Sequence, residues 1–208
     1  MEKETIEAVT DDPREQLKRY QEKYRYSIRH PGAFWAELAY ENYSWENRDE
    51  FFKRNEHNER ENFDARKGDV NVEFFKGAKT NLAYNCLDRN IEKGLGDAPA
   101  IIFESDEGFE REKRCETLTY LQLKEKSDKL ANHLIYVCNV KPGDVVVCYL
   151  PMIPEVVVTM MACARIGAVH NVVFAGYSAE ALAKRIIDSE AKVLVSAAMS
   201  YRGGKAIE

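Results

Sequence analysis

Charged and hydrophobic residues are both abundant in this chain of 208 residues: 31% are charged, 45% are hydrophobic, and the formal net charge is −5. This content of apolar and aromatic residues excludes a disordered chain, and the length suits one large domain or a domain with an appendage. The acidic balance argues against nucleic acid and anionic membranes as partners. The longest apolar stretch, residues 156–164, is far short of the roughly 20 residues of a membrane-spanning helix. The polar N-terminus predicts no secretory signal.

A helix is predicted near the N-terminus. Asp12 is placed as its N-cap, Pro13 as its first residue and Glu15 in its first turn, which is the pattern of a helix start. We expect this helix to run to about Tyr24, before the segment 30–32, His-Pro-Gly, breaks the chain. A second, short helix is predicted from four apolar residues that share one helical face: Phe34, Trp35, Leu38 and Ala39.

Charged side chains of both signs crowd residues 46–69, where apolar residues are few. Such a run is typical of a solvated surface. A short strand is predicted at residues 70–75. We therefore interpret residues 1–94 as a helical and irregular cap region.

From residue 95 onward the pattern becomes that of an α/β domain. A hairpin is predicted from strands at 100–104 and about 111–117. Thr119 and Gln122 form a capping box, which starts a helix. Three apolar runs typical of buried parallel strands then alternate with two helices: residues 145–150, 154–166, 169–174, 178–187 and 192–196.

This order of strands and helices predicts a doubly wound parallel sheet. The predicted fold class is therefore α/β, with the cap region followed by residues 95–208 as the first part of a larger domain. The segment 202–205, Arg-Gly-Gly-Lys, is interpreted as a strand-to-helix turn whose helix has barely begun. We expect the chain to be an N-terminal piece of something longer.

The five cysteines are widely spaced, and neither they nor the four histidines have the spacing of metal ligands. We predict small, buried, free thiols in a reducing, cytoplasmic environment and no metal site made by these residues. The sequence has no P-loop, zinc-protease or nucleophile-elbow motif, and no acid and base can be paired by spacing. No residue is therefore predicted to be catalytic.

Two glycine-containing loops follow buried strands, where open α/β sheets bind their ligands. In the segment 174–177, Phe-Ala-Gly-Tyr, small residues admit a ligand to the backbone and the rings can stack on a flat ring. In the segment 202–205, two glycines expose backbone N–H groups between two cations, which suits a phosphate. The alternative for each loop is that glycine serves the turn and the cations are only solvated.

Most of the chain from about Phe34 onward resembles the AMP-forming acetyl-CoA synthetases, a family of adenylate-forming ligases. The similarity is specific in the combination and order of its segments, and the first thirty residues contribute little. The segments that carry it are YNCLDR at 84–89, TY at 119–120, KPGD at 141–144, PMIPE at 151–155, ACARIGA at 162–168, VVFAGYSA at 172–179 and YRGGK at 201–205.

The resemblance implies a two-step reaction. Acetate and ATP form acetyl-adenylate and pyrophosphate, and the thiol of CoA then attacks to give acetyl-CoA and AMP, with Mg²⁺ accompanying ATP. It also implies that Arg202 and Lys205 neutralise the phosphates of CoA, while Gly203 and Gly204 admit the nucleotide to the backbone. The residues implied around the adenine ring are Phe174, Ala175, Gly176 and, close by, Ile207.

The chain departs from many relatives at two of these positions. Ala175-Gly176 stands where many have two glycines, so a methyl group narrows the pocket, and Lys205 replaces an arginine. Lysine offers a point charge in place of a bidentate fork. The family's ATP phosphate loop, adenylate-binding motifs, acyl pocket and C-terminal lysine have no counterpart in these residues. We therefore expect this chain alone to be inactive.

Alternatives remain at this point. The same N-terminal patterns occur in propionate and acetoacetate ligases. The chain also fits a non-catalytic CoA- or nucleotide-binding module, or a structural segment that self-associates through Trp35 and Trp45. The expected partners are the small molecules acetate, ATP and CoA, without nucleic acid or membrane, and homo-oligomerisation is left open.

Overall fold

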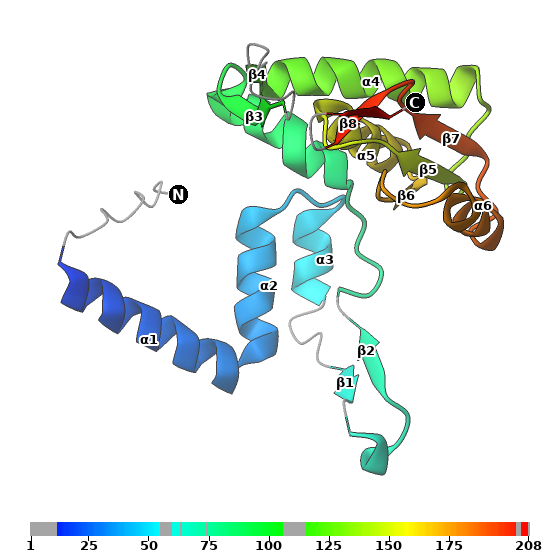
Figure 1. Ribbon diagram of the computed structural model, residues 1–208. Helices are drawn as coiled ribbons and strands as arrows, with labels where there is room; N and C mark the ends of the chain where they lie inside the picture. Colours follow the sequence, from blue (N-terminus) through cyan, green and yellow to red (C-terminus); the bar gives the residue numbers. More distant parts are fainter. Residues whose placement is uncertain are drawn as a thin grey trace. The chain divides into compact units, whose positions relative to one another are not determined.

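A computed structural model describes residues 12–54, 60–62, 64–73, 75–105, 115–202 and 205–207. The chain forms two compact units, Met1–Thr80 and Asn81–Glu208. The first is mostly helical and the second combines helices with a parallel sheet, so the predicted α/β class is confirmed (Figure 1). The predicted domain boundary near residue 95 stays a prediction. Within the described part of the chain, each helix is too short or too polar to cross a membrane.

The first helix of the N-terminal unit, α1 (Pro13–Arg29), starts where the sequence predicts. The Asp12 carboxylate accepts a hydrogen bond of 2.9 Å from a backbone N–H of the first turn. The helix continues past its predicted end at Tyr24, because nothing opposes a helix before Pro31, whose ring disfavours helical geometry at the preceding residue. That residue, His30, has φ −135° and ends the helix.

Trp45 lies between α2 (Pro31–Asn42) and α3 (Arg48–Arg54) in the sequence and is the centre of an aromatic cluster. The indole N–H of Trp45 donates to the Ala39 carbonyl at 2.9 Å. Two of the rings it contacts come from the charged run that the sequence predicts to be solvated surface, so this run also contributes to packing. The four rings whose centroids lie 5.4 to 6.5 Å from that of Trp45 are Tyr43, Phe51, Phe52 and Phe75.

A short antiparallel ladder completes the described part of this unit. Strand β1 (Arg60–Asn62) pairs with β2 (Asn71–Glu73). The 3₁₀ turn η1 (Ala65–Lys67) lies between them, and the Asp64 side chain caps it through the Arg66 N–H at 3.0 Å. The strand predicted at 70–75 is therefore present in a shorter form.

The predicted hairpin of the α/β unit is confirmed. Strand β3 (Pro99–Glu104) pairs antiparallel with β4 (Cys115–Thr119), and residues 106–114 lie outside the described residues. Helix α4 (Tyr120–Tyr136) follows directly with its capping box: the Gln122 N–H donates to the Thr119 hydroxyl at 3.2 Å, and the Thr119 N–H donates to the Gln122 side chain at 2.9 Å.

Three strands form the parallel sheet in the order β6-β5-β7: β5 (Val145–Tyr149), β6 (Val169–Val172) and β7 (Val193–Ser196). Helix α5 (Pro154–Ile166) joins β5 to β6, and α6 (Ala179–Asp188) joins β6 to β7. The two connections move to opposite sides of β5, so right-handed crossovers place their helices on opposite faces of the sheet. This is the doubly wound arrangement that the sequence predicts.

The ends of α5 and α6 follow from local sequence. Pro154 occupies the first turn of α5, and Gly167 ends that helix with φ 73°, a left-handed conformation that glycine adopts without penalty. A Cβ added at Gly167 would also lie 3.4 Å from the Cβ of Pro142. Ser178 caps α6 by accepting from the Ala181 N–H at 3.3 Å.

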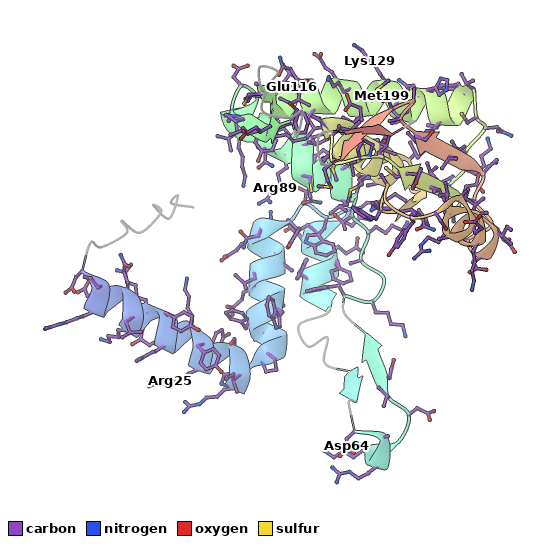
Figure 2. All side chains as sticks on the ribbon, viewed as in Figure 1. Arg25, Asp64, Arg89, Glu116, Lys129 and Met199 are labelled. Atoms are coloured by element: carbon purple, nitrogen blue, oxygen red, sulfur yellow. The ribbon has the colours of Figure 1, made fainter. Side chains whose placement is uncertain are left out.

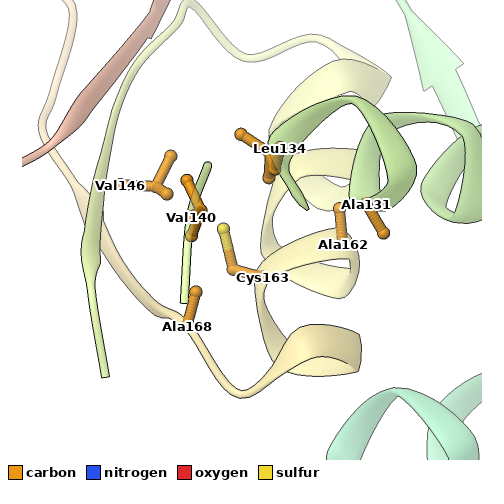
Figure 3. Packing of buried hydrophobic residues seen from close by; sticks show 7 residues of the cluster. All are labelled: Ala131, Leu134, Val140, Val146, Ala162, Cys163 and Ala168. Atoms are coloured by element: carbon orange, nitrogen blue, oxygen red, sulfur yellow. The ribbon is translucent and has the colours of Figure 1, made fainter. Parts of the chain in front are cut away.

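Both faces of β5 are buried. On one face, Val146 and Leu134 are at most 1% exposed, and Cys163 of α5 points toward Val140 and Val146 (Figure 3). Val147 is also fully buried, and its side chain points to the other face because side chains alternate along a strand. The core of this unit therefore sits on the central strand.

Residues 82–95 form a helical segment for which the sequence analysis makes no prediction. It contains two π-helical stretches, η2 (Tyr84–Asp88) and η3 (Ile91–Leu95). The side-chain amide of Asn81, just before the segment, donates to the carbonyls of Ala164 and Arg165 at 3.0 and 3.1 Å. Those carbonyls belong to the last turn of α5, whose final carbonyl groups have no partner within the helix.

A half-buried ion cluster fastens the same segment to α4 and α5. Arg165 of α5 lies 2.6 Å from the Asp88 carboxylate and 3.1 Å from that of Asp128 on α4. Lys124, also on α4, pairs with Asp128 at 2.5 Å and lies 3.7 Å from Asp88. Each charge of the cluster therefore faces an opposite charge.

The C-terminal segment differs from its prediction. In place of a strand-to-helix turn, β8 (Ser200–Arg202) and β9 (Lys205–Ile207) form an antiparallel pair. Arg202 is paired with Lys205, so two residues separate the strands. Lys205 pairs with the preceding strand where the sequence predicts a helix start, so that prediction is wrong.

We predict that Leu134→Ala destabilises the α/β unit strongly. Leu134 is 1% exposed, and truncating a buried leucine typically costs about 2–5 kcal/mol of unfolding free energy, since it leaves a cavity. The matched control is Leu121→Ala on the same helix, where the side chain is 41% exposed and the expected loss is below about 1 kcal/mol. Urea denaturation followed by circular dichroism measures both. Equal losses would contradict the assignment of the core.

We predict that the Asp144 carboxylate makes stability depend on pH in acid. Its hydrogen bonds to Lys192 Nζ at 2.9 Å and the Lys141 N–H at 2.7 Å hold its pKa below the usual value. The stabilisation is therefore complete above about pH 4, the region of an unfolded aspartate, and is lost as pH falls through the lower, folded pKa. Asp144→Asn and Lys192→Met should both weaken the acid dependence in denaturation measured from pH 2 to 7. An unchanged dependence in Asp144→Asn would refute this.

Candidate functional site

The carboxyl edge of the parallel sheet gathers both loops that the sequence singles out. Because β5, β6 and β7 are parallel, their carboxyl ends lie at the same edge. The loop 173–178 leaves β6 there, and the β8–β9 hairpin follows β7 after three residues. The strand order reverses at β5, which lies between the other two. Such a reversal is where open α/β sheets bind ligands.

The loop 174–177 is a tight turn attached to the end of β5. The Tyr177 N–H donates to the Phe174 carbonyl at 3.0 Å, which closes the turn. The Val173 N–H donates to the Cys148 carbonyl at 2.9 Å, which ties the start of the loop to β5. The Tyr149 hydroxyl lies 3.0 Å from the Ala175 carbonyl and 2.9 Å from that of Tyr177.

The two rings of this loop form an exposed aromatic pair. The Phe174 and Tyr177 centroids are 6.0 Å apart with planes at 89°, an edge-to-face contact. The guanidinium of Arg185, on α6, lies over the Tyr177 ring at 4.4 Å from its centroid, a cation–π contact. Phe174 is 57% exposed, so a flat ligand can reach its ring.

The structure brings the predicted residues to the sheet edge in two groups. Phe174, Ala175 and Gly176 lie together in the first loop. The backbone of Arg202 and Lys205 is paired across the hairpin, and Ile207 is paired with Ser200. The predicted residues Gly203 and Gly204 lie outside the described residues. The sequence analysis does not predict Tyr149 or Arg185 as part of this site. For Tyr149 the available signal was its polar tip at the end of an apolar strand.

The buried cysteines of this unit are not suited to nucleophilic chemistry. Burial, followed by the nearby Cys148 thiol, raises the pKa of Cys163 to about 11, and burial also raises the pKa of Cys148. Both side chains are fully buried. Among the described residues, no group of three or more histidine, cysteine or acidic side chains is placed to hold a metal ion.

Comparison with known proteins assigns the chain to a class. The model of the family described as "AMP-binding enzyme" matches residues 87–206, more than half of the chain. The chain belongs to this family. The match includes the whole parallel sheet, the loop 174–177 and the β8–β9 segment as far as residue 206.

The match becomes more specific in the remaining part of the chain. Residues 20–86 match the model described as "Acetyl-coenzyme A synthetase N-terminus". The chain is 46% identical over 191 residues to acetyl-coenzyme A synthetase, chloroplastic/glyoxysomal, of Arabidopsis thaliana, with 90% of this chain and 24% of that protein covered. It is 45% identical over 189 residues to the acetyl-coenzyme A synthetase of Desulfatibacillum aliphaticivorans, with 91% and 27% covered.

A third relative extends the match further along this chain. The acetyl-coenzyme A synthetase of Halorhodospira halophila is 42% identical over 201 residues, which are 97% of this chain and 29% of that protein. The chain thus spans about a quarter of the length of the curated relatives it matches. The resemblance seen in the sequence motifs is confirmed.

We predict that the cysteines react with a thiol reagent in two classes. The predicted burial of the thiols is confirmed for Cys148 and Cys163 and is wrong for Cys115, which is exposed. The raised pKa of Cys163 keeps its thiol protonated at pH 8. An aqueous aromatic disulfide reagent should therefore modify Cys115 in the native protein, and the two buried thiols only in denaturant. Peptide mass mapping identifies the sites. Rapid modification of native Cys163 would contradict its burial.

Proposed function

We propose that the protein acts, in its full length, as an acetate–CoA ligase that forms AMP. The similarity that extends over nine tenths of this chain to proteins named acetyl-coenzyme A synthetase supports this function. Their names favour acetate over the propionate and acetoacetate alternatives. They also favour an enzyme over a binding or structural module.

The proposed reaction has two steps. An acetate oxygen attacks the α-phosphorus of ATP and pyrophosphate leaves, which gives acetyl-adenylate. The sulfur of CoA then attacks the acetyl carbonyl carbon, its proton is released and AMP leaves, which gives acetyl-CoA. Mg²⁺ accompanies ATP in this proposal. The described residues contain no cluster suited to a metal, and none of them is assigned to it.

In this proposal the chain's own role is to bind CoA at the carboxyl edge of the sheet. Arg202 and Lys205 neutralise the phosphates at the nucleotide end of CoA, and Gly203 and Gly204 let these phosphates approach the backbone. The exposed ring of Phe174 offers a face for adenine. The remaining residues assigned to the adenine pocket are Ala175, Gly176 and Ile207.

The observation that best supports this CoA site is the arrangement of the sheet. The loop 174–177 follows β6 and the β8–β9 hairpin follows β7, so both lie at the carboxyl edge of the sheet, on opposite sides of β5. Their strands are two positions apart, or about 10 Å. One ligand with a flat base and several phosphates can span that separation. We further propose that the protein works in the cytoplasm with acetate, ATP and CoA as its partners.

The test is calorimetric titration of CoA into the chain and into the double variant Arg202→Ala, Lys205→Ala. We expect the parent to bind and the double variant to bind roughly tenfold or more weakly, because contacts with charged groups are the stronger ones. Dephospho-CoA lacks one phosphate, so the affinities of the parent and the double variant should differ less for dephospho-CoA than for CoA.

The matched control removes two positive charges elsewhere. Lys93 and Lys129 are both exposed, and Lys129 lies on α4 (Figure 2). The variant Lys93→Ala, Lys129→Ala should bind CoA like the parent. Equal weakening in both double variants would indicate a general charge effect. Absence of binding by the parent would contradict a CoA site formed by this chain.

A further inference from the structure

The Tyr149 side chain links two parts of the sheet edge that are far apart in the sequence. Its ring is half-buried at the last position of β5. Its hydroxyl lies 3.0 Å from the carbonyl of Ala175 and 2.9 Å from that of Tyr177. A tyrosine hydroxyl has one proton, so it donates to one carbonyl at a time or shares the proton between both.

We propose that Tyr149 is a positioning residue for CoA: its hydroxyl fixes the peptide groups of the loop 174–177 and thereby orients Phe174 toward the adenine ring. This inference rests on the proposed function, because it takes the loop as part of the CoA site. It assigns to Tyr149 no contact with CoA and no part in the chemistry.

The geometry of the peptide group determines where the N–H groups of the loop point. A trans peptide is planar and carries its N–H opposite to its C=O. When the carbonyls of Ala175 and Tyr177 face the Tyr149 hydroxyl, the N–H groups of Gly176 and Ser178 therefore point away from it. One hydroxyl thus sets the direction of two peptide planes on either side of the most pliable residue of the loop, Gly176.

The direction of these peptide planes also determines the position of the exposed rings. The Tyr177 ring is held by Arg185 at 4.4 Å, and its contact with Phe174 is edge-to-face. This contact needs a fixed separation of the two residues, which the turn bond from the Tyr177 N–H to the Phe174 carbonyl provides. Tyr149 holds the carbonyl side of the same residue. Without it, the loop backbone can rotate at Gly176 and the aromatic pair loses its fixed direction.

The strongest competing explanation is that Tyr149 only fills space beside the buried strand. The variant Tyr149→Phe separates the two roles because it keeps the ring and removes the hydroxyl. Tyr136→Phe is the matched control, since Tyr136 is 81% exposed on α4 and lies outside the proposed CoA site. Tyr149→Leu removes the ring as well and reports the effect of lost packing.

The first measurement is hydrogen–deuterium exchange, which needs no ligand. In Tyr149→Phe we expect the Tyr177 amide, which donates to the Phe174 carbonyl, to exchange about fivefold faster, because the turn loses the stabilisation of about one net hydrogen bond. Exchange in β5 and α4 should remain unchanged, and Tyr136→Phe should match the parent throughout. Unchanged exchange in the loop, or an equal rise across the whole unit, would overturn the inference.

The second measurement is CoA binding by calorimetry. We expect the dissociation constant of the CoA complex to rise about fivefold in Tyr149→Phe. The ratio of the dissociation constants for dephospho-CoA and CoA should stay that of the parent, because the hairpin still binds the phosphates. A loosened loop with unchanged CoA affinity overturns the positioning role and leaves the proposed function standing. A parent chain that fails to bind CoA overturns the CoA site, and the positioning role with it.

Discussion

The α/β unit depends on burying both faces of β5. This strand consists of five apolar residues, so both of its faces must be removed from water. Val146, Val147 and Cys148 are fully buried. Burial on both faces requires helices above and below the sheet and a paired strand on each edge, which are the features of a doubly wound sheet. The same constraint brings the carboxyl ends of three strands to one edge. The candidate site is therefore a consequence of the core.

The parts of this fold that the sequence predicts are those with local causes. Helix starts at Asp12, Thr119 and Ser178 are set by side chains that accept hydrogen bonds from the first turn. The end of α5 is set by a glycine in the left-handed conformation. The order of apolar runs predicts the parallel strands. In the site, the loop 174–177 follows from its position after an apolar strand, although its roles in binding come from family resemblance.

The parts that escape prediction depend on distant partners. The helical segment 82–95 is held by Asn81 and Asp88, whose partners on α4 and α5 lie far along the chain. Phe51 and Phe52 lie within a charged run, and their packing is visible only once Trp45 is placed beside them. The sequence places the polar tip of Tyr149 at the end of an apolar run but does not indicate its partners, the carbonyls of Ala175 and Tyr177. The Tyr149 hydroxyl acquires a role only when the loop has folded back over it.

The links made by Asn81 and Asp88 also mean that the boundary of the family match is not a boundary of folding. The AMP-binding match begins at residue 87, but Asn81, which satisfies the last carbonyls of α5, belongs by sequence to the preceding match. A gene fusion or excision that followed the family boundary would remove the hydrogen bonds of Asn81 to the Ala164 and Arg165 carbonyls and leave only the backbone cap at Gly167 on the end of α5. Residues 81–86 therefore belong structurally to the α/β unit, and a substitution at Asn81 acts on the stability of α5.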